Sequence, residues 1–206
     1  MLQKLMQLLA MGLCCSSYAG KFTIVDQTSD SISITYTGTV EEQDVDRWRE
    51  IKGNGKDRTI KLLINSRGGK AKASVDLFWE LHKYPKLITI AGNTVGAWSG
   101  AAIMWLGGKD RQVEAGAMVM FHAPYCNWDE ESNPDIGCNI DYICFQFEQV
   151  FTASGFNGQK FIYNLRHIQQ SFGTDGWLGI LGNMDKWYMI DTGTLTITRF
   201  DIKGLQ

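Results

Sequence analysis

The sequence predicts a single α/β domain with a largely parallel sheet, and three observations lead to this prediction. Short apolar segments typical of strands alternate along the chain with segments whose apolar residues recur at helical spacing. Helix candidates separate successive strand candidates, as in βα units, whose crossovers make neighbouring strands parallel. No repeat, low-complexity stretch or Pro/Ser-rich linker interrupts residues 20–206, so no domain boundary is expected there.

The first elements follow from side-chain periodicity. Apolar and polar residues alternate over 31–37, which predicts a strand with one buried face. Over 40–51 the apolar residues recur at the spacing of one helix face. Residues 59–64 form a short apolar run that leads into Asn-Ser-Arg-Gly-Gly at 65–69, so a strand and a tight turn are expected there.

The middle of the chain repeats this alternation. A helix is expected around 75–81, and Pro85 ends it. The short apolar runs 87–91 and 117–121 predict strands, whereas the longer apolar run 99–106 predicts a helix.

After residue 122 the rhythm changes. Residues 125–139 are polar and rich in turn formers, and the segments 140–151 and 159–172 then have helical periodicity. Residues 194–200 are expected to form a final strand.

Residues 1–19 have the features of a secretory signal peptide. Lys4 provides a positive charge, residues 5–13 are almost entirely apolar, and Ser17 and Ala19 are small residues at the two positions that a signal peptidase reads. Cleavage is therefore predicted after Ala19, which leaves residues 20–206 as the mature domain and predicts a periplasmic or secreted protein.

Two alternatives for this segment stay open. It could be a short helix of a cytosolic protein, or Cys14 or Cys15 could carry a lipid, although the small residue usual before such a cysteine is missing. The apolar run is too short to span a bilayer, and no later segment reaches the roughly 18–20 apolar residues that a spanning helix needs.

Charge and cysteine content exclude some functions. The formal net charge is −2 without a Lys/Arg cluster, which disfavours nucleic acid as a partner. In an oxidising compartment we expect a disulfide between Cys126 and Cys138, which would close a polar loop and leave Cys144 as a free thiol. A metal site is disfavoured because no CxxC motif or neighbouring histidine completes a ligand set.

The diglycine segment over 64–69 is the first candidate for chemistry. Paired glycines after a buried strand bring bare N–H groups against a ligand, and such groups can stabilise an oxyanion. The alternative is a plain tight turn.

Ser99 is the candidate nucleophile, because it stands where a turn feeds an apolar helix and the Gly100 N–H follows it. The alternative is that Ser99 only caps the helix. Ala97 stands two residues before the serine, so the segment is not the G-x-S-x-G elbow of α/β-hydrolases.

His122 is the candidate base. An alcohol needs a neighbouring base to be nucleophilic near neutral pH. The chain has three histidines, of which His82 and His167 lie in predicted amphipathic helices and only His122 follows a strand.

Taken in order, these segments resemble the proteolytic subunit of Clp proteases over residues 31–125. The likeness rests on the strand, Thr-Gly-x-Val turn and helix over 33–51, the diglycine segment, the helix after the candidate nucleophile, and the strand with Arg111 and the candidate base. Arg67 replaces the usual proline of the diglycine motif, and a glycine replaces the larger residue usual after the nucleophile.

The resemblance implies a Clp/crotonase-like spiral of ββα units. It implies Ser99 as nucleophile, His122 as general base, and the N–H groups of Gly68 and Gly100 as the oxyanion hole. It implies no cofactor and a peptide or protein substrate. Clp subunits form rings, so self-association is plausible, but outside the cytoplasm, where ATP is absent, an ATP-driven unfoldase partner is not expected.

The third member of a catalytic triad is less clear in the sequence. Asp185, followed by a basic and then an aromatic residue, resembles the aspartate of the family, while Asp175, Asp191 and Asp141 remain open.

The sequence therefore predicts an exported serine hydrolase, in particular an endopeptidase. A crotonase-like acyl-thioester enzyme is disfavoured by the Ser–His pair and by export, because coenzyme A is scarce outside the cytoplasm. A Ser–Lys dyad through Lys70 or Lys72 explains less than His122 does. A catalytically inactive binding protein of the same fold is the non-enzymatic alternative, and the distance between the serine hydroxyl and the imidazole should discriminate between the two.

Overall fold

The described strands form one ten-stranded sheet that divides into two branches at its third strand. The computed structural model describes residues 19–54, 57–125, 139–172, 176–181, 187–191 and 196–200. The elements in chain order are β1 (Lys21–Gln27), β2 (Ser31–Val40), α2 (Gln43–Asn54), β3 (Thr59–Gly69), α3 (Ala71–His82), β4 (Leu87–Ala91), β5 (Ala97–Trp98), α4 (Gly100–Leu106), β6 (Asp110–Val113), β7 (Met118–Phe121), α6 (Ile140–Ala153), α7 (Gly158–Phe172), β8 (Gly176–Leu181), β9 (Trp187–Asp191) and β10 (Thr196–Phe200).

Several predicted features lie outside the described residues. They are the first eighteen residues of the predicted signal peptide, both cysteines of the predicted disulfide (Cys126 and Cys138), and the aspartates Asp175 and Asp185. Each of these stays a prediction. Cys144 is described, and it is a buried free thiol.

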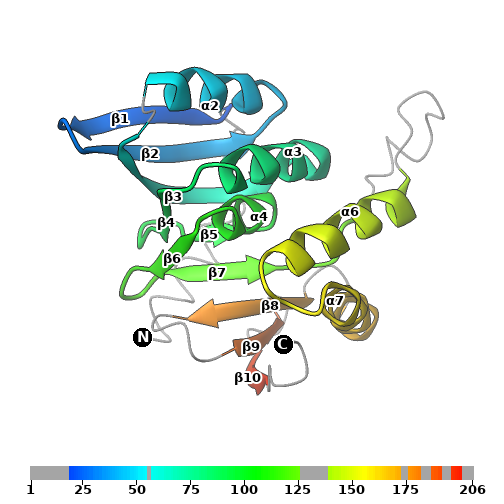
Figure 1. Cartoon of the computed structure of the whole chain (residues 1–206). Helices are drawn as coiled ribbons and strands as arrows, with labels where there is room; N and C mark the ends of the chain where they lie inside the picture. The colour runs from blue at the N-terminus through cyan, green and yellow to red at the C-terminus, as the bar shows by residue number, and fades with distance from the viewer. Residues whose placement is uncertain are drawn as a thin grey trace.

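The centre of the sheet is parallel, as the alternation of strands and helices predicted, and its two ends are antiparallel. β2 shows the expected period of two, with Ile32, Ile34 and Tyr36 buried. At one end β1 pairs antiparallel with β2, and at the other β8, β9 and β10 follow β7 in antiparallel order (Figure 1). The strands β1, β5, β6, β8 and β9 were not predicted; β5 has two residues, and in β1 only Phe22 is partly buried.

The branch at β3 positions the site. β3 pairs parallel with β2 along one edge. Along its other edge, Ile60–Ile64 pairs with β4, and the end of the strand pairs with β5 through Ser66 and Ala97. β4 pairs in parallel with β6, whereas β5 pairs in parallel with β7. The carboxyl ends of β3, β5 and β7 therefore lie side by side.

The predicted turn over 65–69 is wrong in one respect, because these residues continue β3 to its end. Opposite them the register shifts between Thr37 and Thr39 of β2, so that Gly68 pairs with Thr39 and Gly69 with Val40. Gly68 and Gly69 have φ angles of 97° and 159°, which side-chain-bearing residues rarely adopt, so glycines are needed where the end of β3 pairs beside the bulge.

The helices pack against the sheet and share one core with it. Buried side chains of α2, α3 and α4 join those of the central strands, and α6 and α7 lie side by side next to β7 and β8 (Figure 1). Every residue of α4 is buried, which explains its continuous apolar sequence. Within the described ranges, no helix is both long enough and apolar enough to cross a membrane.

Candidate active site

Ser99 stands between β5 and α4 in a strained backbone conformation. Its φ is 53° and its ψ is −124°, and Asp57 is the only other non-glycine residue with positive φ among the described residues. Such a conformation costs about 1–3 kcal/mol and persists at functional sites when the surroundings impose it. Here the Ser99 amide donates to Met120 O at 2.8 Å, which fixes the turn to β7.

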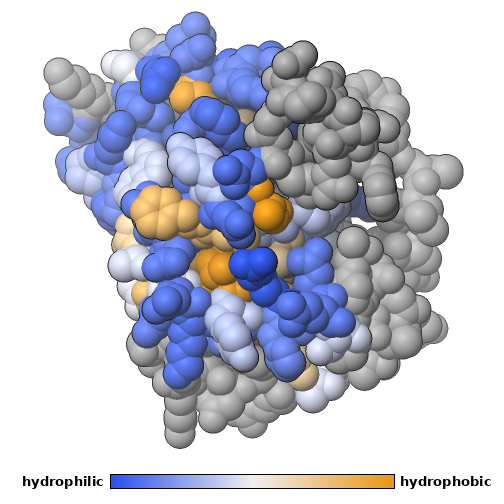
Figure 2. All heavy atoms as spheres, turned by 90° about the vertical axis from the view of Figure 1, so that its right-hand side faces the viewer, coloured by the Kyte–Doolittle hydropathy of each residue, from blue (hydrophilic) through white to orange (hydrophobic). Residues whose placement is uncertain are grey.

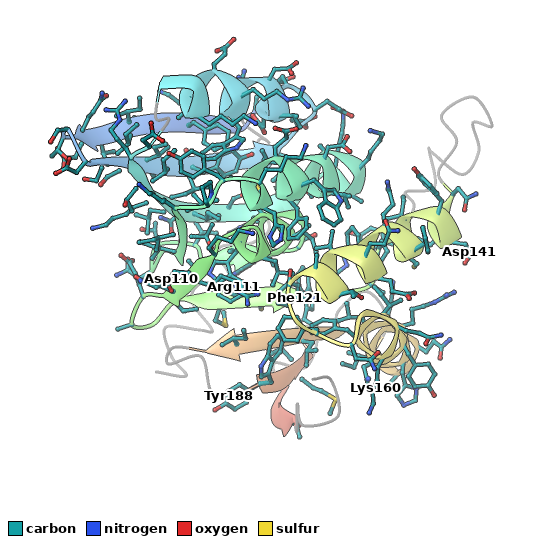
Figure 3. All side chains as sticks on the ribbon, in the orientation of Figure 1. Asp110, Arg111, Phe121, Asp141, Lys160 and Tyr188 are labelled. Atoms are coloured by element: carbon teal, nitrogen blue, oxygen red, sulfur yellow. The ribbon has the colours of Figure 1, made fainter. Side chains whose placement is uncertain are left out.

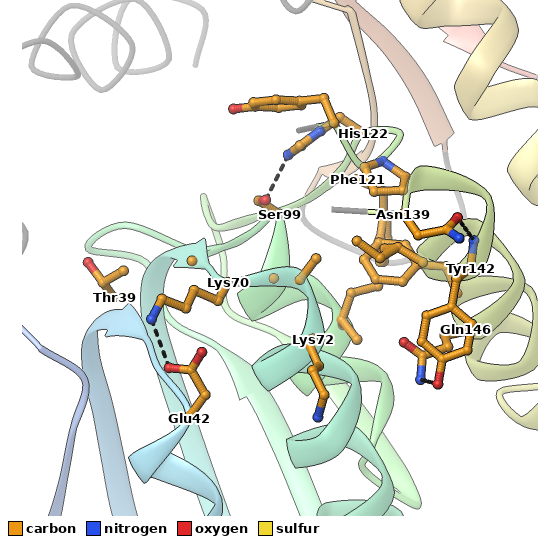
Figure 4. Close-up of a pocket in the computed structure, with 18 residues that line it drawn as sticks. Thr39, Glu42, Lys70, Lys72, Ser99, Phe121, His122, Asn139, Tyr142 and Gln146 are labelled. Carbon is orange, nitrogen blue, oxygen red and sulfur yellow. Dashed lines mark hydrogen bonds and ion pairs between the residues drawn. The ribbon is translucent and has the colours of Figure 1, made fainter. Parts of the chain in front are cut away.

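The side chains of Ser99 and His122 meet. Ser99 Oγ lies 2.7 Å from His122 Nε2 (Figure 4). The serine makes no capping hydrogen bond to α4, so the alternative of a plain helix cap is wrong. The predicted pair is therefore within hydrogen-bond reach, with the serine after β5 and the histidine after the neighbouring strand β7.

The other ring nitrogen of His122 fixes the tautomer. Nδ1 lies 2.7 Å from Ala123 O. Because a carbonyl oxygen only accepts, Nδ1 carries the proton, and Nε2 of the neutral ring is left to accept from the Ser99 hydroxyl. This is the arrangement that a general base needs.

Aromatic side chains enclose the imidazole. The Trp177 ring of β8 lies edge-on at 4.4 Å between ring centroids, and the Tyr125 ring is tilted at 5.3 Å. Burial lowers the pKa of His122 below its usual value, against a smaller opposing effect of the hydrogen bond to Ala123 O. The ring is therefore neutral at neutral pH and available as a base.

Gly68 and Gly100 approach each other closely beside Ser99. Gly68 has a φ of +97°, and a Cβ at this position would lie 2.6 Å from Gly100 N and 2.8 Å from Ser99 Cβ. The missing side chain therefore keeps the Gly100 amide uncovered. The Gly68 amide itself donates to Ser66 Oγ at 3.1 Å, and that hydroxyl donates to Gly38 O at 2.6 Å.

Ser74 is a residue of the site that the sequence analysis missed. A Cβ on Gly100 would overlap Ser74 Oγ, which donates to Lys70 O at 2.8 Å. The side chain is fully buried. This contact explains why a glycine replaces the larger residue after the nucleophile. The available signal was a serine on the same helix face as Phe78 and Leu81, where an apolar residue is expected.

A cavity of about 740 Å³ extends from the Ser–His pair between α3, α4 and α6. One wall is mainly apolar, with Ile103, Phe121, Ile143 and Phe147, and Asn139, Tyr142 and Gln146 also line it. The opposite wall carries polar and charged side chains, among them Thr39, Glu42, Lys70 and Lys72 (Figure 4).

The two lysines of this wall form ion pairs with carboxylates. Lys70 Nζ lies 2.9 Å from Glu42 and 3.0 Å from Glu41, and Lys72 Nζ lies 2.6 Å from Asp76. Hydrogen bonds to these carboxylates raise the pKa of both lysines. A protonated lysine cannot accept the serine proton, which disfavours the Ser–Lys alternative.

Strand register bears on the third triad member. His122 follows Phe121, which pairs with Leu178 of β8. On the β8–β9 hairpin, Gly176 pairs with Asp191 near this end, whereas Ile180 pairs with Trp187 at the other end. Of the candidate aspartates, Asp191 at the end of β9 is therefore on the side of His122, while Asp175 and Asp185 lie outside the described residues.

Asp141 is placed directly. Figure 3 shows it at the outer end of α6, away from Phe121 and β7. Its side chain is 83% exposed and its carboxylate lies 3.9 Å from Arg166 Nη1, so it does not orient the imidazole. Within the described ranges, no group of three or more His, Cys, Asp or Glu residues could hold a metal ion.

Arg111, which the sequence likeness included, lies away from the reacting groups. Its guanidinium is packed over the rings of Trp105 and Phe156 and donates to Ser154 O at 3.2 Å (Figure 3). It ties β6 to the turn between α6 and α7.

Comparison with known proteins gives one family. The family model described as Clp protease matches residues 19–160. The match spans β1 to the start of α7 and includes the serine, the histidine and both glycines of the site, and it ends before β8. No curated protein matches the chain.

Proposed function

Since this chain belongs to the Clp protease family, we propose that it is a serine endopeptidase that works outside the cytoplasm. Membership supports a peptidase-like hydrolase. The finer proposal is that Ser99 is the nucleophile and His122 its base, with backbone amides as the oxyanion hole. The observation that carries this proposal is the 2.7 Å contact between Ser99 Oγ and His122 Nε2.

In the proposed reaction Ser99 Oγ attacks the carbonyl carbon of a peptide bond, and its proton passes to His122 Nε2. The negative charge that develops on the carbonyl oxygen is stabilised by the Gly100 amide, and by the Gly68 amide once it leaves Ser66 Oγ. The tetrahedral intermediate then collapses and releases the amine, which takes the proton from Nε2. A water molecule, activated by the same nitrogen, then hydrolyses the acyl-enzyme.

The direct test is labelling with a fluorophosphonate probe, which forms a covalent bond with an activated serine. We expect the wild-type chain to be labelled, Ser99→Ala to lose labelling completely, and His122→Asn to lower the labelling rate by about 10²–10⁴-fold. Ser171→Ala is the matched control, because this exposed hydroxyl only bonds to His167 O in α7. Labelling of Ser99→Ala at the wild-type rate would reject this nucleophile.

The same assay assigns the third triad member, for which Asp185 was the sequence prediction. Asp191 competes with it, because Asp191 pairs with Gly176 at the end of β8 near His122, and Asp175 remains a sequence candidate. Asn substitutions at the three positions should leave one variant slowed by about 10²-fold or more. Asp141→Asn is the control, since that side chain is exposed at the outer end of α6.

The apolar wall of the cavity supports a substrate with an apolar side chain next to the scissile bond. Ile103, Phe121, Ile143 and Phe147 line this wall beside the nucleophile. Hydrolysis of fluorogenic peptides that carry Leu, Lys or Asp at this position measures the preference. We propose that the Leu peptide is cleaved fastest, because burying a leucine side chain contributes about 1.5–3 kcal/mol.

The alternative function is a catalytically inactive binding protein. One observation favours it: His122 Nδ1 bonds to the carbonyl of Ala123, an uncharged partner. A carbonyl orients the ring but stabilises the imidazolium less than a carboxylate does. Saturable peptide binding by a chain that no serine-directed probe labels would establish this alternative.

Export and partners complete the proposal. Residues 1–19 are proposed to direct the chain out of the cytoplasm, so that peptides reach the cavity without an ATP-driven unfoldase. Fractionation of cells that express the full chain tests this location directly. Recovery only in the cytoplasm would contradict it.

A further inference from the structure

A buried carboxylate lies where the chain enters the fold. Gly20 is buried, whereas Ala19 before it is exposed. The Asp44 side chain, which is fully buried, contacts Gly20, and Arg47 Nη1 donates to Gly20 O at 2.5 Å. A Cβ on residue 20 would overlap both Asp44 Oδ2 and Tyr36 Oη, so this position accepts only glycine.

The described partners of Asp44 leave capacity for one more donor. Oδ2 accepts from the Tyr36 hydroxyl at 2.8 Å and from the Glu41 amide at 2.9 Å, and Oδ1 accepts from Arg47 Nη1 at 3.0 Å. A carboxylate offers about four acceptor positions. Arg47 is 43% exposed, so solvent weakens the cation that pairs with this buried charge among the described residues.

The sequence supplies a second cation at this place. Cleavage predicted after Ala19 makes Gly20 the first residue, and its amide nitrogen becomes an α-amine. The change from an exposed to a buried residue occurs at the same bond, and Ala19 before it forms a parallel β-bridge with Thr39.

We propose that the pocket formed by Tyr36, Asp44 and Arg47 receives a processed N-terminus at Gly20. Water hydrolyses the Ala19–Gly20 peptide bond, so that the carboxylate stays on Ala19, and the new amine at Gly20 binds a proton. The resulting α-ammonium pairs with Asp44 and compensates its buried charge. Processing thereby locks the first strand onto the sheet through an ion pair that the uncut chain lacks.

The first measurement is the intact mass of the full chain after expression in a bacterial host and recovery from the cell envelope. We expect the mass of residues 20–206. A chain that keeps Ala19, or that begins beyond Gly20, would overturn the proposal.

The second measurement is the rate at which acetic anhydride modifies the Gly20 α-amine, read by peptide mass spectrometry. An exposed α-amine, with a pKa of about 8 against about 10.4 for lysine, reacts before a lysine at neutral pH. The exposed side chain of Lys21 is the internal standard. We expect the α-amine in the folded protein to react at least about 10-fold more slowly than in the unfolded chain, and equal rates would reject the ion pair.

A matched pair of variants identifies the carboxylate. Asp44→Asn should restore fast modification of the Gly20 amine, whereas Asp46→Asn on the same helix should not, because Asp46 is 76% exposed and pairs with Arg49. Protection that persists in Asp44→Asn contradicts the assignment. If Asp44→Asn does not fold, the comparison of folded and unfolded wild-type protein decides alone.

Neither measurement depends on catalysis. The Ser99→Ala variant should show the same mass and the same protection, so a failed hydrolase proposal and a failed N-terminal pocket give different results.

Discussion

The backbone holds Ser99 in place, and the residues around it are small because larger side chains would overlap their neighbours. The Ser99 amide bonds to β7, Gly68 leaves the Gly100 amide uncovered, and Gly100 in turn makes room for Ser74 Oγ. The sequence predicted the Ser–His pair from residue types at the ends of strands. The serine at position 74 breaks the apolar face of its helix, but the sequence does not show that its partner is Gly100 of α4, because that contact is tertiary.

The contact between Gly100 and Ser74 gives a prediction about packing. Gly100→Ala should lower the free energy of unfolding by about 1–3 kcal/mol, because the added methyl group overlaps Ser74 Oγ. Ser74→Ala in the same chain should recover part of this loss, with a coupling of at least about 0.5 kcal/mol in a double-mutant cycle measured by urea unfolding.

The control for this experiment is Gly53→Ala in α2. A Cβ at this position meets nothing within 4 Å, so the substitution should stabilise the helix by about 0.5–1 kcal/mol. Additive effects of the two substitutions at positions 74 and 100 would contradict the proposed contact.

The buried imidazole gives a prediction about pH. Burial lowers the pKa of His122, so the neutral base persists to lower pH than it does for a free histidine, whose pKa is about 6.5. The rate of fluorophosphonate labelling should therefore rise with pH to a plateau, with its midpoint below about 6.5. A midpoint above this value would mean that a nearby negative charge outweighs burial.

At the scale of elements, α2 and α3 are joined by ion pairs around one carboxylate. Glu80 of α3 is 9% exposed and contacts Lys52 and Arg49 of α2, as well as Lys83. The hydrogen bond from Lys52, with those from Arg49 and Lys83, lowers the pKa of Glu80 to about 2. This stabilisation is present above the ordinary glutamate pKa and is lost as the pH falls toward 2.

The prediction concerns the stability of this pair of helices. Glu80→Gln should lower the free energy of unfolding by about 1–2 kcal/mol at neutral pH, and the difference from wild type should shrink between about pH 4.5 and 2. Asp76→Asn, which breaks the more exposed pair with Lys72 within α3, should cost less than about 0.5 kcal/mol in the same unfolding measurement. Equal losses for the two variants would contradict a special role of Glu80.

The sequence predicted these helices better than it predicted the strands. The helical periods around 40–51, 75–81 and 140–151 correspond to α2, α3 and α6, because each helix buries one long face. β5 has only two residues, and β3 ends in two glycines, which are also typical of a turn. Their strand character comes from pairing with neighbours, which local sequence does not encode.

For the whole molecule, exposed aromatic side chains gather on the paired helices α6 and α7. Tyr142, Phe145 and Tyr163 are between 54% and 68% exposed. On the side of the molecule that carries these helices, Figure 2 shows apolar areas between polar side chains. This composition is typical of an interface, so we expect the chain to self-associate through α6 and α7.

Sedimentation velocity at micromolar concentration measures this expectation. The double variant Phe145→Ser and Tyr163→Ser should raise the dissociation constant for self-association at least about 10-fold. Ile24→Ser with Val25→Ser is the control, because these residues are exposed on β1 at the other end of the sheet. A wild-type chain that sediments as a monomer would contradict the prediction.

The parallel core was predictable from the sequence at this scale, and the order of its strands was not. Alternating helices and strands indicate βα units, but they do not show that β3 pairs with both β4 and β5 along one edge. β5 pairs with the end of β3 although the two strands are far apart in the sequence, and α4 packs against both of them.

That branch has a consequence for how the site can vary. The serine, the histidine and the diglycine lie at the ends of β5, β7 and β3 on one arm of the branch, and α6 lines the cavity from the other side. Substitutions on the cavity face of α6 can therefore change the shape of the cavity, while the Ser–His pair keeps its place.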